Sequence, residues 1–260
     1  MASCFGKCRA VTVPGSGGDA IDALTAFVFA ILMMLLNGSV LGLVRNEMPD
    51  ALRAAAESWR LATLLVACGM VVFIARDAYT VWFMRPTANA LLTLALMLYG
   101  RGLRRFYGLP DRLWMLAPTV LTWFGVLWFD AVTPSAVGSI AVSSVCWLFI
   151  MSDTLRMLRS KWSNKVTSHR IMVFIYAGVA LFTAGRLVWL LRLPDAAFSP
   201  LASQWLINTL TPLILGVLPV IGTSVFLLMC SDRIRRDWEH AATTDYLTGL
   251  PNRRALAGEG

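Results

Sequence analysis

Residues 21–44, which read IDALTAFVFAILMMLLNGSVLGLV, decide the fold. Apart from Asp22 at its start, the run is apolar, with only mild polarity at Thr25, Asn37 and Ser39. A helix needs about 20 mostly apolar residues to cross the hydrocarbon core of a bilayer, where no solvent can satisfy unpaired backbone groups. The run is also too long and too poorly cleavable for a secretory signal peptide. We therefore predict a membrane-spanning helix that is retained in the mature protein.

The rest of the chain has the same character. Of its 260 residues, 57% are hydrophobic and 15% are charged, and the mean hydropathy is +0.65, which excludes a disordered or purely soluble protein. Six further apolar segments are candidate spans. They are residues 61–75 (extended by 54–59), 81–100, 113–132, 133–151, 171–191 and 205–230. The sequence therefore predicts an all-α membrane protein, a bundle of about seven transmembrane helices over residues 21–230.

The basic residues predict the orientation. The net charge is +8, and Lys and Arg are retained on the cytoplasmic side of membrane proteins. With residues 1–20 as an exterior tail, 17 of the 23 Lys and Arg lie on inside segments and five lie outside, while Arg186 falls within the sixth span. We therefore predict an N-out/C-in topology. Because the basic residues are spread over four inside segments, no nucleic acid partner is expected; the lipid bilayer is the expected surrounding.

A polar segment, residues 231–244, follows the last span and is predicted to be a cytoplasmic signalling helix. Ile234, Trp238 and Ala241 continue a spacing of 4 and 3 residues that is typical of a coiled-coil seam. A solvated helix on which Trp238 packs locally would show the same pattern. The seam is short, so the choice between the two depends on what comes next.

Residues 244–256 read TDYLTGLPNRRAL. Thr248 and Gly249 indicate a turn, and Asn252 can cap a helix that starts at Arg253. The string closely resembles the opening of the GGDEF domain, the diguanylate cyclase module, which reads TDxLTGLxNRR after a helical linker. The residues that carry the resemblance are Asp245, Leu247, Thr248, Gly249, Leu250, Asn252, Arg253 and Arg254.

The resemblance implies a function for the whole protein. In that family, two facing α/β domains each present one GTP with magnesium and condense the pair to cyclic di-GMP, so a homodimer is expected. Residues 245–260 correspond to the entry segment, which orients the catalytic core, and no Gly-Gly-Asp/Glu-Glu-Phe turn follows. The chain as given is therefore expected to be inactive, either a fragment of a longer protein or a prematurely ended reading frame. No cofactor or metal is expected within it.

The resemblance thus predicts the sensory input region of a diguanylate cyclase in a bacterial inner membrane, responding to an unidentified small-molecule or membrane cue. Two other classes remain open. A small transporter or channel could line its path with Asn37, Asn89, Asp130, Arg186 and Asn208, although inverted repeats and paired broken helices are absent from the sequence. A catalytically dead anchor that dimerises with intact cyclases would also fit.

Arg186 is the clearest candidate for sensing, since an ionisable group within a span is costly. We predict that Arg186, Asn208, Trp189 and Trp128 form an outward-facing site for a small anionic or amphiphilic ligand, with Asp130 as the resting counter-ion. The alternative is that Arg186 simply pairs with Asp130 or extends to the interface.

Pro212, Gly216 and Pro219 predict a kink in the last span. Straightening of this hinge could reorient two cyclase domains, although a static kink filled by packing is equally compatible with the pattern. His169 and His240 both lie outside the spans, so neither a haem nor an intramembrane metal site is expected.

Overall fold

The computed structural model describes residues 23–78, 82–161, 167–192 and 206–243. These residues form helices joined by short connections, and no strand occurs among them. Seven α-helices follow one another: α1 (Ala23–Val44), α2 (Asp50–Ala78), α3 (Met84–Phe106), α4 (Ala117–Ala131), α5 (Ala136–Ser160), α6 (Thr167–Leu190) and α7 (Leu206–Thr243). Two 3-10 turns, η1 (Arg45–Glu47) and η2 (Leu113–Leu116), precede α2 and α4.

Five of these helices, α1, α2, α5, α6 and α7, are long and apolar enough to cross a membrane. The prediction of an all-helical, membrane-embedded protein is confirmed at that level. The count of seven spans stays a prediction, because α4 has only 15 residues and α3 ends in Arg104 and Arg105. The uncertain second segment is one helix of 29 residues, so residues 54–59 do continue it.

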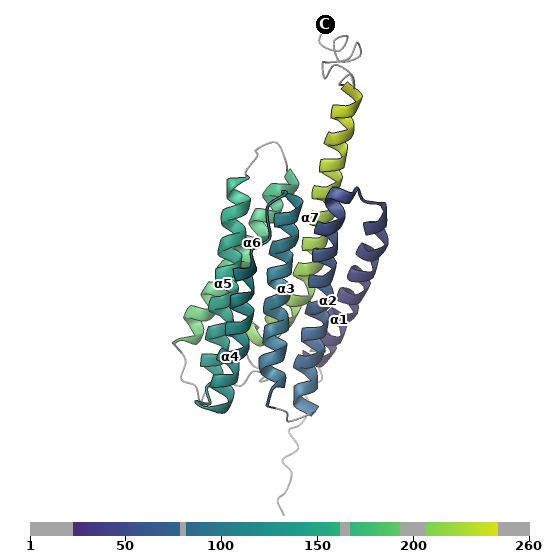
Figure 1. Cartoon of the computed structure of the whole chain (residues 1–260). Coiled ribbons are helices and arrows are strands. Elements are labelled where there is room, and N and C mark those ends of the chain that lie inside the picture. The colour runs from purple at the N-terminus through teal and green to yellow at the C-terminus, as the bar shows by residue number, and fades with distance from the viewer. Residues whose placement is uncertain (1–22, 79–81, 162–166, 193–205, 244–260) are drawn as a thin grey trace, which may run out of the picture.

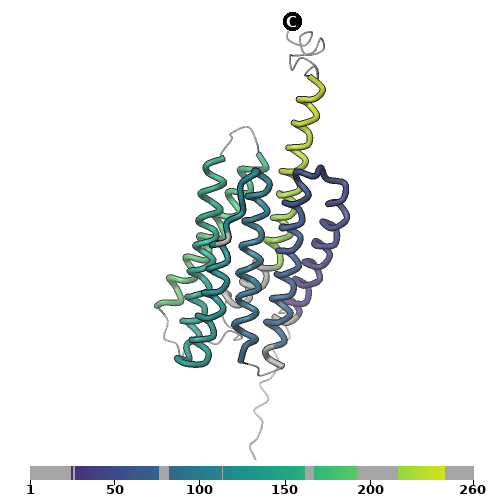
Figure 2. The backbone as a smooth tube through the Cα atoms, in the orientation of Figure 1, coloured from purple at the N-terminus to yellow at the C-terminus, as the bar shows by residue number. Residues whose placement is uncertain are grey.

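The helices form an antiparallel bundle from which the end of α7 projects (Figure 1). Both α2 and α7 pack beside α1, and α3 packs extensively on α2, as the tube trace also shows (Figure 2). Small residues allow this closeness. A Cβ added at Gly216 of α7 would lie 2.7 Å from the Cβ of Ala30 in α1, and one added at Gly102 of α3 would lie 3.2 Å from the carbonyl oxygen of Ala55 in α2.

An aromatic cluster forms the centre of the core between α2, α3 and α7. The Trp59 ring stacks on Phe226, with ring centroids 4.5 Å apart, and meets Tyr99 edge to face at 4.8 Å. Trp59 is 2% exposed and Phe226 is fully buried. In contrast, large apolar side chains such as Phe29, Leu36 and Leu181 project outward, as expected where a helix faces lipid.

Basic residues gather at the end of the bundle from which α7 leaves, which we call the exit end (Figure 1). Lying toward it are Arg45, Arg53, Arg60, Arg101, Arg104, Arg105, Arg112, Arg156, Arg159, Lys161, Arg170, Arg233, Arg235 and Arg236. The opposite end, here the far end, has Arg76, Arg85 and Arg192 among the described residues. Such an excess of basic residues at one end is what the predicted N-out/C-in orientation requires, and the orientation itself stays a prediction.

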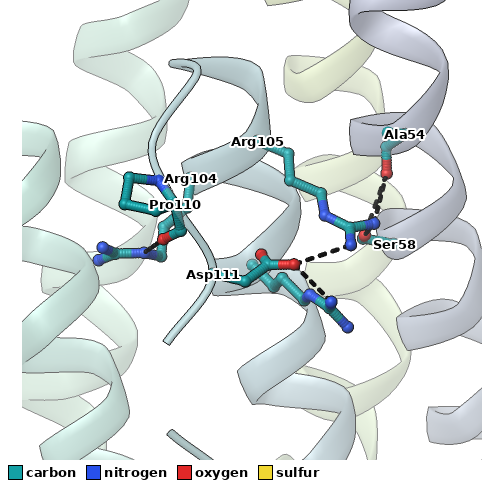
Figure 3. Close-up of polar contacts among 7 residues, drawn as sticks. Ala54, Ser58, Arg104, Arg105, Pro110 and Asp111 are labelled. Atoms are coloured by element: carbon teal, nitrogen blue, oxygen red, sulfur yellow. Dashed lines mark hydrogen bonds and ion pairs between the residues drawn. The ribbon is translucent and has the colours of Figure 1, made fainter. Parts of the chain in front are cut away.

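Asp111 organises the connection from α3 to α4 at the exit end (Figure 3). Its carboxylate accepts hydrogen bonds from Arg101 and, at 2.9 Å, from Arg105, whose guanidinium also donates to Ser58 Oγ of α2 at 2.9 Å. The hydrogen bond from Arg101 is the main cause that lowers the pKa of Asp111 to about 2. Gly108 turns the chain here with φ +67°, a left-handed conformation that favours glycine.

Candidate functional site

A cavity of about 130 Å³, partly open to its surroundings, is lined by α2, α3, α5, α6 and α7. Its wall consists mostly of aliphatic and aromatic side chains. The members of the wall that carry a polar group in the side chain are Trp59, Tyr99, Trp147, Tyr176, Thr183 and Arg186. The cavity is therefore apolar with a single formal charge, that of Arg186.

Arg186 lies near the end of α6 and is half-buried. Its Nε is buried without a hydrogen-bond partner, and within the described part of the chain no carboxylate pairs with its guanidinium. Arginine stays protonated in proteins, and a buried charge without a partner is unfavourable. The wall thus presents an unneutralised cation to an apolar space.

Asp130 is not the counter-ion of Arg186, and that prediction is corrected. The Asp130 carboxylate lies 3.0 Å from Arg85 Nη1 and accepts a hydrogen bond of 3.1 Å from Ser139 Oγ. The physical reason is helix order: α4, which carries Asp130, packs on α3 and α5, whereas α6 packs on α5 and α7.

Two further predicted partners of Arg186, Trp128 and Trp189, do not line the cavity. Trp128 is 56% exposed on α4, and Trp189 is not part of the cavity wall. Asn208 falls in α7, but its side chain lies outside the described residues. The cavity instead joins Arg186 to Trp59 and Trp147. Both are interior to α2 and α5, whereas the predicted spans 61–75 and 133–151 place Trp59 and Trp147 near their ends.

Polar tips of the cavity wall are bonded outward, to the helices behind it. The indole N–H groups of Trp59 and Trp147 donate to Thr223 and Thr93, each at 2.9 Å. The hydroxyl of Tyr99 donates to Thr63 at 3.0 Å. Because these N–H and O–H groups are hydrogen-bonded within the protein, the wall is more apolar than its residue types suggest.

Two asparagines considered for a transport path serve helix packing instead. Asn37 of α1 donates to Thr223 Oγ1 of α7 at 3.0 Å, and Asn89 of α3 accepts from Ser143 of α5 at 3.3 Å. Because each amide is hydrogen-bonded to a neighbouring helix, neither side chain lines an open polar path.

The hinge residues lie within one continuous helix, because α7 runs through Pro212, Gly216 and Pro219 without interruption. Pro219 forms part of the cavity wall, and its carbonyl accepts hydrogen bonds from Thr223 at 2.8 Å and Asn37 at 3.4 Å. The hinge is thus supported by α1 and lies directly against the cavity.

Beyond the bundle, α7 continues as the predicted signalling helix (Figure 1). Ile234 packs against the core, while Trp238 is 72% exposed and Ala241 is exposed. The helix ends at Thr243, and the entry motif from Asp245 to Arg254 lies outside the described residues, as does the tail of residues 1–20.

Where α7 leaves, two contacts hold it to α6 and α3, and a third joins α6 to the end of α3. Asp232 accepts a hydrogen bond from Ser168 of α6 at 2.6 Å, and Arg233 donates to the carbonyl oxygen of Phe106 at the end of α3. The adjacent Tyr107 hydroxyl is 2.6 Å from His169 Nδ1. Burial raises the pKa of Tyr107 to about 12. We call these contacts the exit clamp.

Within the described ranges no group of three or more His, Cys, Asp or Glu could hold a metal ion. No family model matches this chain, and no curated protein or solved structure matches it.

Proposed function

We propose that this chain is the membrane-embedded input region of a diguanylate cyclase in a bacterial inner membrane. Seven transmembrane helices in an N-out/C-in orientation precede a GGDEF domain that begins at Asp245. The observation that carries the proposal is the TDYLTGLPNRR string of residues 244–254, placed directly after a helix that leaves the bundle. GTP and magnesium would belong to the GGDEF domain and not to the bundle.

The continuity of α7 supports this function. From Pro219 at the cavity wall to Thr243 the helix has no break, and at about 1.5 Å per residue it spans roughly 36 Å. A helix of that kind can transmit a shift or rotation from the cavity to a domain attached at its end. The exit clamp would define its resting position, because it bonds α7 to both α3 and α6.

A second copy of the chain is the expected partner. Two cyclase domains must face each other to join two GTP, which brings the two copies of α7 together. Trp238 offers a largely exposed aromatic surface beyond the bundle, on the same helix face as Ile234 and Ala241. Tryptophan is enriched among the residues that dominate binding energy at interfaces.

The test begins with the coding sequence after codon 260, followed by expression of the full-length product in membranes. Formation of cyclic di-GMP from GTP and magnesium is expected. Trp238→Ala should lower that output about tenfold or more, whereas His240→Ala, on the opposite face of the same helix, should leave it unchanged. A following sequence without a Gly-Gly-Asp/Glu-Glu-Phe turn, or full-length protein without product, would contradict the proposal.

A further inference from the structure

We infer that the cavity binds a small amphiphilic carboxylate, with its carboxylate on Arg186 and its apolar body between Trp59, Trp147 and Tyr176. This ligand class deepens the proposed function, on which it rests only for its consequence, the regulation of cyclic di-GMP output. The geometry of the cavity supplies the argument.

The anionic group follows from Arg186. Among the described residues its buried Nε has no hydrogen-bond partner, and the acid that the sequence suggested, Asp130, is bonded to Arg85. A guanidinium offers several N–H donors in a fixed plane that matches the two oxygens of a carboxylate. An anion that reached the cavity would remove an unfavourable buried charge and gain charge-assisted hydrogen bonds at the same time.

The apolar body follows from the rest of the wall. Besides Trp59 and Trp147, whose N–H groups are hydrogen-bonded to Thr223 and Thr93, the wall contains aliphatic side chains from four helices, and the Tyr99 hydroxyl donates to Thr63. An apolar cavity of about 150 Å³ in another protein stays dry and binds benzene. At about 130 Å³, this cavity fits an apolar body of similar size. A medium-chain or aromatic monocarboxylate has that composition.

The direction of the ligand follows from α6. The helix contributes Met172 at one end of the cavity and Arg186 at the other, about 21 Å apart at the rise of an α-helix. Since α6 runs toward the far end of the bundle, Arg186 lies nearer that end and Met172 nearer the exit end. The carboxylate would therefore lie toward the far end, with the chain extending inward along α6.

The occupant would touch the transmitting helix. Pro219 and Gly222 of α7 belong to the wall, and Trp59 donates its indole hydrogen bond to Thr223 of the same helix. A ligand that packs on Trp59 would thus bear on α7 at the predicted hinge.

The experiment uses the 260-residue chain in bilayer nanodiscs and octanoate as the probe, with binding of the labelled molecule measured directly. Saturable binding is expected in phosphatidylcholine discs. Arg186→Gln should weaken it at least tenfold, and Arg170→Gln, an exposed arginine on the same helix, should leave it unchanged. Octanol, which has the chain but no charge, should bind at least tenfold more weakly than octanoate.

A second variant covers the case in which Arg186→Gln fails to fold. A Cβ at Gly222 would lie 3.6 Å from Trp59, an ordinary contact, so Gly222→Leu places its larger branch in the cavity and retains Arg186. Loss of octanoate binding in this variant is expected. Discs of phosphatidylglycerol test the other source of an anionic headgroup: unchanged octanoate affinity supports a free carboxylate, and loss of it would assign the cavity to lipid.

Five results would overturn the inference: no saturable binding by the unaltered chain, equal binding by Arg186→Gln, equal binding of octanol, unchanged binding by Gly222→Leu, or loss of octanoate affinity in phosphatidylglycerol discs. None of these measurements needs GTP or a cyclase domain. Their failure would therefore leave the proposed cyclase function in place, and absence of cyclic di-GMP would leave the ligand site in place.

Discussion

Two parts of the bundle treat polar side chains in opposite ways. Between α3, α4 and α5, several polar side chains bond one another: Arg85 pairs with Asp130, Asn89 bonds Ser143, and Thr93 bonds Trp147 and Thr122. Between α6 and α7, Arg186 lines a cavity, and within the described part of the chain its Nε has no partner.

The difference separates structure from function. A polar group within a membrane helix is unremarkable once a neighbouring helix satisfies it, because the bond then contributes to packing. An unsatisfied charge beside an open space has no such explanation. The residues considered for a transport path belong mostly to the first kind, and Arg186 belongs to the second.

The largest expected effect comes from removing the Trp59 ring from the cavity wall. Trp59→Ala should lower the free energy of unfolding by about 3–5 kcal/mol, because it deletes a buried ring that stacks on Phe226 and bonds Thr223. Trp128→Ala is the matched control, since that ring is 56% exposed. Reversible unfolding in mixed detergent would measure both, and equal effects would mean that Trp59 does not anchor this core.

Arg186→Leu should change the free energy of unfolding in the opposite direction. Without ligand, the substitution removes a half-buried charge for which the described residues supply no counter-ion, and it should raise the free energy of unfolding by about 1–3 kcal/mol. The same unfolding measurement applies, with Arg85→Leu as the comparison, which should destabilise because it strands Asp130. A destabilised Arg186→Leu would show that Arg186 is bonded in the bundle, and the contrast between the two regions would fail.

Asn89→Leu should destabilise by about 1–2 kcal/mol, because its amide donates to the Arg85 carbonyl and accepts from Ser143. Octanoate affinity should remain unchanged, since Asn89 is not part of the cavity wall. Measuring unfolding and binding on the same variant separates the two roles. A change in affinity without a change in stability would move Asn89 from packing to ligand recognition.

The smallest effect concerns Asp111, outside both regions. Its folded pKa of about 2 lies below the ordinary value near 3.9, so its ionised form stabilises the fold above that ordinary value and the contribution is lost as pH falls through about 2. Because the side chain is partly exposed, Asp111→Asn should cost only about 0.2–1 kcal/mol at pH 7, and less at high salt. An unfolding series between pH 7 and pH 2 should show the difference shrinking, and a constant difference would contradict the ion-pair explanation.

Hydropathy alone predicted where the helices are, because a long apolar run in lipid must satisfy its own backbone. The predicted helix boundaries were wrong where a proline or a short 3-10 turn changed the start of a helix. We expected the third segment to begin at residue 81, but α3 begins at Met84, with Pro86 in the first turn, where proline fits because its missing N–H has no helical partner. The short η2 turn likewise moves the start of α4 to Ala117.

The candidate site was predicted only in part. Arg186 was recognised from its charge within an apolar run, which is a property of one residue and its neighbours in sequence. Its surroundings were not, because Trp59, Trp147 and Tyr176 come from α2, α5 and α6, and nothing in the sequence pattern says which faces of these helices meet.

The sequence by itself determined a helical, membrane-embedded chain with basic residues on alternate connections, and it predicts an entry motif after α7. These are local properties, set by hydropathy and charge over some 20 residues. Only the tertiary structure decided that Asp130 belongs to Arg85 and that Arg186 faces a cavity instead. The physical reason is that an ion pair depends on which helices are neighbours, and helix order arises from packing between segments far apart in the chain.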